Sequence, residues 1–184
     1  MRRHRRPVAV LLTAAGISFA ALVMAGASGS STELPGMVRH SDSVASHLKT
    51  FDDLDFDVFS NQKWDRLGES HADDIVVTWP DGHQTKGIAK HIEDLKAMFV
   101  YAPDTQIKVH PIKFGSGEWT CVTGVMTGTF SRPMPIPDGS TIAPTGKTFK
   151  MAMATIGQWK NGKMIAESLF WDNQEFMRQI GLVK

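Results

Sequence analysis

The hydrophobic positions in the first half of the chain recur at helical intervals. The first helix is predicted from residue 42, with Ser41 or Ser43 as its N-cap, and its apolar stripe consists of Val44, Leu48, Phe51 and Val58. A second apolar stripe follows Gly87 and ends before Pro103; it consists of Ile88, Ile92, Leu95, Met98 and Phe99. A short helix over 64–71 and a strand over 74–79 are expected between the two stripes.

The second half of the chain has strand character. Strands are predicted over 105–114, 118–130, 148–159 and 163–172, and a terminal helix over 174–182. Helices followed by a run of antiparallel strands are typical of an α+β domain, with N-terminal helices packed on an antiparallel sheet.

The last two strands can be placed in register from the sequence. Asn161-Gly162 is a strong signal for a two-residue hairpin turn, because both positions require positive φ. Lys160 is then expected opposite Lys163, and Met151 opposite Asp172. Side chains alternate between faces, so one face is predicted to hold Met151, Met153, Thr155, Ser168, Phe170 and Asp172, and the other Glu167 and Trp171.

Asp172 follows apolar residues directly and shares its predicted face with two methionines and a phenylalanine. Burial there disfavours the charged form of a carboxyl group and suits it to general acid/base chemistry near neutral pH. Asp172 could equally be the N-cap of the terminal helix, since Asp is favoured at that position. The two roles are compatible. Glu167 is predicted on the other face, so a pair of catalytic carboxylates is not expected.

The N-terminus reads as an export signal. Four arginines in the first six residues precede an apolar run that ends in Ala25-Gly26-Ala27, which predicts a cleaved signal peptide over 1–27. An uncleaved membrane anchor is the alternative, although Thr13, Gly16 and Ser18 interrupt the run. Residues 28–41 are expected to form a flexible spacer and residues 42–184 the domain. The mature protein would therefore be periplasmic or extracellular.

Charge and cysteine content narrow the possible functions. The full chain carries +1, and residues 1–27 contain four arginines and no acid, so the remainder carries −3. A mildly acidic domain offers no footprint for nucleic acid and no basic surface for a membrane after cleavage. Cys121 is the only cysteine and cannot form an internal disulfide. The acidic cluster Asp52, Asp53, Asp55 and Asp57 lacks the glycine and closing glutamate of a calcium loop and is expected to be a solvated helix face.

Several other residues are candidates for a pocket. His91 lies at the edge of the second apolar stripe, where it could point into a pocket or be an ordinary buried histidine. Trp79 and Trp119 could line the pocket mouth, and Met151, Met153 and Phe170 are expected to shape its wall. His83 and His110 are expected in a turn and at a strand edge. The histidine spacing indicates no metal site.

Three segments in order resemble the SnoaL-like polyketide cyclases. They are "DDIVVTWPDGHQTKGIAKHIEDL", the loop "RPMPIPDGSTIAPTGKTF", found in relatives described as ester cyclases, and "NGKMIAESLFWDNQEFMRQIGL". The resemblance covers about residues 42–182. It implies the cone-shaped fold of nuclear transport factor two and the ketosteroid isomerases, in which helices close a curved sheet around an apolar pocket.

The resemblance also implies an activity: proton transfer in an aldol-type ring closure of a small hydrophobic carbonyl compound or ester, with no metal or organic cofactor. The residue matching the family's catalytic aspartate is Asp172. Family members often carry a histidine on the strand before the hairpin turn, and 148–159 contains none. An exported, non-catalytic binding module and a related isomerase or epoxide hydrolase therefore stay open as alternatives. A homodimer packed through the second sheet face, including Leu169 and Trp171, is also expected.

Overall fold

The computed structural model describes residues 38–184, with side-chain environments from residue 43 onward. The predicted signal peptide 1–27 and most of the predicted spacer lie outside these residues. Within the described part of the chain, no helix is both long and apolar enough to cross a membrane.

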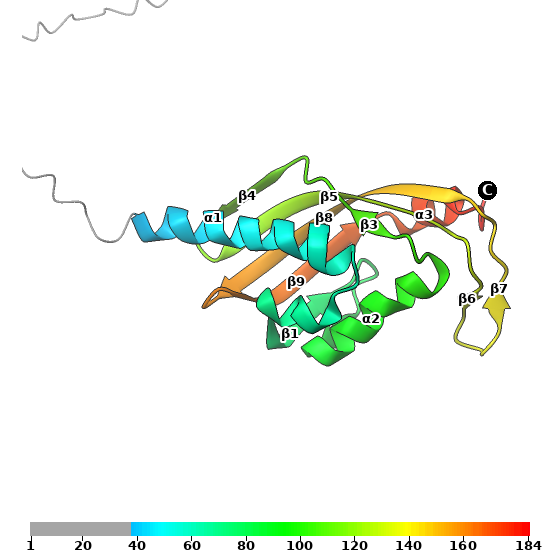
Figure 1. Ribbon diagram of the computed structural model, residues 1–184, viewed down its shortest axis with the longest axis horizontal. Helices are drawn as coiled ribbons and strands as arrows, with labels where there is room; N and C mark the ends of the chain where they lie inside the picture. The colour runs from blue at the N-terminus through cyan, green and yellow to red at the C-terminus, as the bar shows by residue number, and fades with distance from the viewer. Residues whose placement is uncertain (1–37) are drawn as a thin grey trace, which may run out of the picture. The chain divides into compact units, whose positions relative to one another are not determined.

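The helices of the described domain cover one face of a sheet (Figure 1). Helix α1 (Val38–Asp53) begins four residues before the predicted domain boundary and runs directly into a π-helical turn, η1 (Leu54–Phe59). A 3-10 helix, η2 (Trp64–Glu69), and helix α2 (Ile88–Tyr101) follow. Their apolar sides face the sheet because the helical spacing of the apolar residues places them on one side of each helix.

The main sheet has the order β2-β1-β9-β8-β5-β3, with β4 also paired to β5. Its strands are β1 (His71–Thr78), β2 (Gln84–Lys86), β3 (Gln106–Ile107), β4 (Lys113–Ser116), β5 (Trp119–Thr129), β8 (Thr148–Lys160) and β9 (Lys163–Trp171). All pairs are antiparallel except β1 with β9, which run parallel. Strands β6 (Met134–Pro135) and β7 (Thr141–Ile142) form a separate hairpin, and α3 (Asn173–Gln179) ends the fold.

The long central strands curve around the helices (Figure 1). Two clusters of buried side chains fill the space between the layers. One gathers around Trp159, Phe51 and Leu67, and the other around Phe149, Phe130 and Phe176. The predicted α+β class, with helices packed on a curved sheet, is confirmed.

The predicted hairpin register is correct only next to the turn. Asn161 and Gly162 have positive φ, and Lys160 lies opposite Lys163. Trp159 still pairs with Met164, but Gln158 pairs with Ala166, so Ile165 is an extra residue in β9. This β-bulge shifts every later pair by one position.

The shift moves the side chains of β9 to the opposite faces from those predicted. Met153 lies opposite Trp171 rather than Phe170. Glu167 and Leu169 are buried on the inner face beside the helices, whereas Phe170 is 51% exposed on the outer face. The predicted grouping of Asp172 and Phe170 with Met151 and Met153 is therefore wrong, because a one-residue shift exchanges the two faces of a strand.

Candidate functional site

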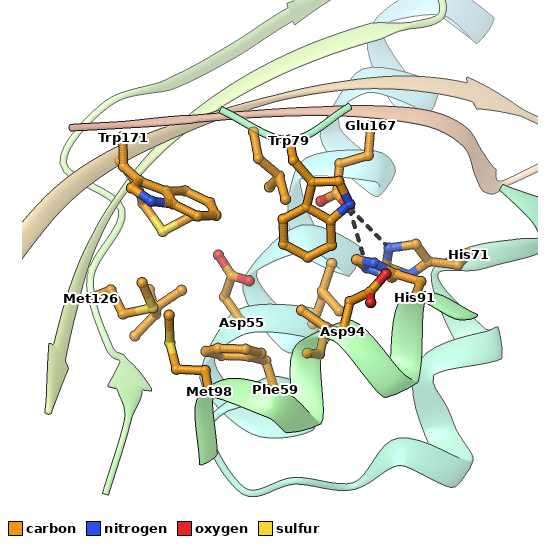
Figure 2. Close-up of a pocket in the computed structure, with 15 residues that line it drawn as sticks. Asp55, Phe59, His71, Trp79, His91, Asp94, Met98, Met126, Glu167 and Trp171 are labelled. Atoms are coloured by element: carbon orange, nitrogen blue, oxygen red, sulfur yellow. Dashed lines mark ion pairs between the residues drawn. The ribbon is translucent and has the colours of Figure 1, made fainter. Parts of the chain in front are cut away.

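An apolar cavity lies between helices η1 and α2 and the inner face of the sheet (Figure 2). Its wall is built mostly from large apolar side chains, and a few titratable groups interrupt it. The lining residues are Leu54, Asp55, Phe59, His71, Trp79, His91, Asp94, Leu95, Met98, Ile107, Met126, Met153, Glu167, Leu169 and Trp171. An apolar cavity with a few convergent polar groups is the usual form of a small-molecule site.

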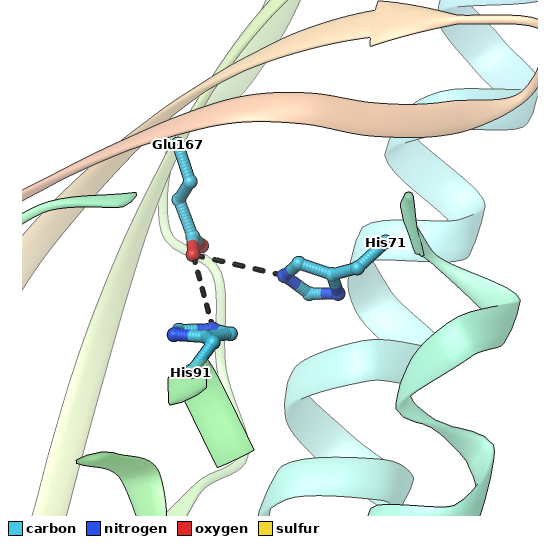
Figure 3. Close-up of side chains that lie close together, drawn as sticks. All are labelled: His71, His91 and Glu167. Carbon is cyan, nitrogen blue, oxygen red and sulfur yellow. Dashed lines mark ion pairs between the residues drawn. The ribbon is translucent and has the colours of Figure 1, made fainter. Parts of the chain in front are cut away.

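One set of polar side chains in the cavity wall consists of His71, His91 and Glu167, which we call the His-Glu-His cluster (Figure 3). The three side chains come from β1, α2 and β9, and all are buried. Glu167 Oε2 lies 3.4 Å from His91 Nε2 and 3.7 Å from His71 Nε2. No hydrogen-bond partner is present among the described residues for His71 Nε2, His91 Nδ1 or Glu167 Oε2. These three atoms of the His-Glu-His cluster are therefore available to bind a ligand or an ion at the cavity wall.

Burial and mutual charge set the protonation of this cluster. Burial lowers the pKa of His91 to about 4, so this imidazole is neutral at pH 7. Burial alone would raise the pKa of Glu167, but the facing imidazoles of His71 and His91 hold it below its ordinary value. A neutral imidazole thus faces an ionised carboxylate.

The second polar group is a chain of hydrogen bonds that leads from the cavity to the surface. Asp55 points into the cavity (Figure 2), and its Oδ2 lies 2.8 Å from His110 Nε2. His110 Nδ1 lies 2.8 Å from Asp52 Oδ1, and Asp52 also pairs with Lys113. The His110 side chain is 1% exposed and that of Asp55 13%. Both nitrogens of His110 can be satisfied only if a proton lies on each side of the ring, so the Asp55–His110 pair shares a proton.

Burial of Asp55 and the hydrogen bonds of His110 shift these two side chains toward their protonated forms. Burial raises the pKa of Asp55 above its ordinary value, although the hydrogen bond from His110 opposes the shift. Burial would lower the pKa of His110, but its hydrogen bonds to Asp55 and Asp52 outweigh that effect and raise it. A cavity-facing carboxyl group with a raised pKa is suited to acid/base chemistry near neutral pH.

The structure brings some of the predicted site residues together and separates others. His91, Trp79 and Met153 line the cavity. Met151 is buried in the core around Phe149 and does not line the cavity. Trp119 is 50% exposed, and Phe170 lies on the outer face of the sheet.

Asp172 does not line the cavity either. Its side chain is exposed and accepts a hydrogen bond from the backbone N–H of Glu175, 2.9 Å away, as the N-cap of α3. The N-cap alternative for Asp172 is therefore what the structure shows. On its outer side, Asp172 borders an open depression beside Phe170.

Sequence reasoning missed His71, Glu167, Asp55 and His110 as site residues. Glu167 was assigned to the wrong face, and His71 to the end of a helix although it begins β1. The acidic cluster is not uniformly solvated, because Asp55 faces the cavity. The sequence does contain a signal that Asp55 faces inward. Phe51, Asp55 and Phe59 are spaced four residues apart and so lie on one helix face.

Comparison with known proteins is consistent with this fold. The structure resembles a proposed SnoaL-like polyketide cyclase from Jannaschia sp. CCS1, with a TM-score of 0.66 and 18% identity over 77% of this chain and 95% of that one. It also resembles IdmH, a proposed polyketide cyclase from Streptomyces antibioticus. That comparison has a TM-score of 0.62 and 19% identity, and it covers 73% of this chain and 98% of IdmH. A third similar structure is an NTF2-like protein of unknown function from Burkholderia pseudomallei. Its TM-score is 0.60 and its identity 16%, over 74% of this chain and 98% of that one.

At these low identities, the structural similarity shows a shared fold and not a shared reaction. A search of curated proteins gives no match. The sequence model of the SnoaL-like polyketide cyclases matches residues 49–180, which include both polar groups of the cavity. The chain belongs to the SnoaL-like polyketide cyclase family.

Proposed function

We propose that this protein catalyses proton transfer on a small hydrophobic carbonyl compound or ester, of the kind needed for an aldol-type ring closure, in the apolar cavity. Asp55 is the acid/base group, and His110 positions it. The observation that carries the proposal is the Asp55–His110 hydrogen bond of 2.8 Å, made by a carboxyl group in the wall of an otherwise apolar cavity.

In the proposed reaction, Asp55 takes a proton from the substrate and later returns it to another atom of the same molecule. Asp55 removes the proton from a carbon flanked by carbonyl groups, and that carbon then forms a bond to a second carbonyl carbon of the same molecule. The proton held by Asp55 goes to the new alkoxide oxygen, which regenerates the carboxylate. One positioned acid/base group contributes about 10²–10⁴-fold to a rate, so the substrate must already have an acidic C–H group.

The surroundings of Asp55 support this role. His110 holds one carboxyl oxygen, and the ring of Phe56 packs 4.4 Å from the His110 ring. Asp52 and Lys113 continue the chain of contacts to the surface, so the proton shared by Asp55 and His110 has a route to solvent. The methionine and tryptophan side chains of the cavity supply an adaptable apolar wall.

The test is ring closure of a panel of hydrophobic β-keto esters that carry a further carbonyl group in the same molecule, by the purified full-length chain. Asp55→Asn keeps the shape of the side chain and is expected to lower kcat about 10²–10⁴-fold. Asp53→Asn, in the same acidic cluster but 49% exposed, is the matched control and should retain the wild-type rate. Equal rates for Asp55→Asn and wild type, with both folded, would remove Asp55 from the proposal.

A non-catalytic binding module is the second candidate. The observation that favours it is the predominance of apolar side chains in the cavity wall. The same panel separates the two functions, because a binding module would take up hydrophobic keto esters with measurable affinity and return them unchanged.

A further inference from the structure

The tautomer of neutral His71 follows from its contact with Ser70. The Ser70 hydroxyl donates its one proton to the carbonyl of Leu67, 3.1 Å away. Its Oγ, 2.8 Å from His71 Nδ1, therefore accepts a hydrogen bond from that nitrogen. In neutral His71 the proton is thus on Nδ1, and the lone pair of Nε2 faces Glu167.

The lone pair of His71 Nε2 and the Glu167 carboxylate are both hydrogen-bond acceptors, so they repel each other unless a cation lies between them. His71 Nε2 and Glu167 Oε2 are 3.7 Å apart, and neither atom has a hydrogen-bond partner among the described residues. Unpaired acceptors buried at this depth cost free energy. A proton could fill the role, but it would draw the two atoms to a hydrogen-bond distance of about 2.7–3.2 Å.

The spacing of the cluster fits a metal ion better than hydrogen bonds. Ligand atoms placed tetrahedrally at 2.0–2.2 Å from a zinc ion lie roughly 3.3–3.6 Å apart. Glu167 Oε2 is 3.4 Å from His91 Nε2 and 3.7 Å from His71 Nε2, and one ligand atom from each of the three side chains lies within 4.8 Å of the others. Figure 3 shows both imidazoles turned toward the carboxylate.

We propose that His71, His91 and Glu167 bind one divalent transition-metal ion, of the class of Zn²⁺, at the wall of the cavity. Two imidazoles and one carboxylate are a ligand set that suits such ions and leaves a further position open. The ligands stand on β1, α2 and β9, so the secondary structure fixes their positions. The Ser70 hydroxyl orients His71 as outer partners of metal-ligating histidines commonly do.

A position left open on a bound ion would be reached from the cavity, because His71, His91 and Glu167 all line it. An ion there would hold a carbonyl oxygen of the bound molecule and draw electron density from it. This consequence rests on the proposed function, whereas metal binding itself does not. The two are tested by different measurements.

The experiment is a titration of the untagged, chelator-treated full-length chain with Zn²⁺ alone, followed by calorimetry, and with Co²⁺ alone, followed by visible absorption. We expect one equivalent to bind. Glu167→Gln and His71→Ala should each weaken binding by more than about 100-fold, since loss of an outer partner alone costs 10–100-fold. His83→Ala, at an exposed histidine paired with Asp81, is the matched control and should bind like wild type.

Two outcomes would overturn the proposal: no stoichiometric binding to the folded wild-type chain, or tight binding that Glu167→Gln and His71→Ala leave unchanged. Circular dichroism of each metal-free variant establishes that it is folded before titration. Asp55→Asn separates the two proposals, because it should lose turnover while it retains the wild-type affinity for Zn²⁺.

Discussion

Met153 of β8 lies opposite Trp171 of β9, one residue beyond the partner that the Asn161-Gly162 turn alone would give it. The bulge at Ile165 causes this shift, and its consequence is chemical. It carries Glu167 to the inner face, where its carboxylate lies near His71 and His91. Asp172, just beyond the end of β9, is the N-cap of α3.

Removal of the bulge should leave the faces of β9 unchanged, whereas a deletion after the bulge should exchange them. Without Ile165, Met164 and Glu167 stand two positions apart, so regular alternation keeps both on the inner face. Deletion of Ser168 instead turns the buried Leu169 outward, and loss of such a core contact costs about 2–5 kcal/mol. Urea denaturation measures both losses, and equal stabilities of the two deletion variants would contradict this register.

Asp172 should matter for stability and not for proton transfer. Asp172→Ala removes the acceptor for the Glu175 N–H and should cost about 1 kcal/mol of unfolding free energy. Asp172→Asn retains a good N-cap and should be near wild type. Thermal unfolding and the keto-ester assay are run on both variants. Loss of turnover in a folded Asp172→Asn protein would show that Asp172 takes part in the reaction.

The two neighbouring methionines on the inner face of β8 should behave differently. Met151 is 2% exposed in the core, so Met151→Ala should cost about 2–5 kcal/mol without changing ligand preference. Met153 lines the cavity and is only partly buried, so Met153→Ala should cost less and shift binding toward bulkier keto esters. Denaturation and competition binding check the pair. Identical effects on ligand preference would contradict the cavity boundary described above.

The stability of the fold should fall as pH rises through the titration of His110. Hydrogen bonds to Asp55 and Asp52 raise the pKa of His110 above 6.5 against the effect of burial. A raised histidine pKa gives stabilisation that is fully present below pH 6.5 and is lost as pH rises through the folded value. Unfolding free energies between pH 6 and 9 should show the decline.

His110→Gln should flatten this pH dependence, whereas His83→Gln, at an exposed position, should leave the wild-type slope. Curves for wild type and His110→Gln that stay parallel over the whole range would exclude a charged His110 in the folded protein. Lys113 and Asp52 are kept unchanged in both variants because they face the same ring or its partner.

The sequence by itself determined the order of the helices and strands, the α+β class and the tight turn at Asn161-Gly162. Those features follow from local periods and turn chemistry, which a sequence displays directly. It also predicted His91, Trp79 and Met153 for a pocket, and all three line the cavity, although the register from which Met153 was predicted is wrong.

Only the tertiary structure decided which carboxyl groups face the cavity. The bulge at Ile165 has no local sequence signal, and one inserted residue exchanges the two faces of everything after it. His71 and Glu167 are 96 positions apart in the chain, and Asp55 and His110 are 55 apart. Contacts of this kind depend on how helices and strands pack together, so only folding assembles both polar groups of the cavity.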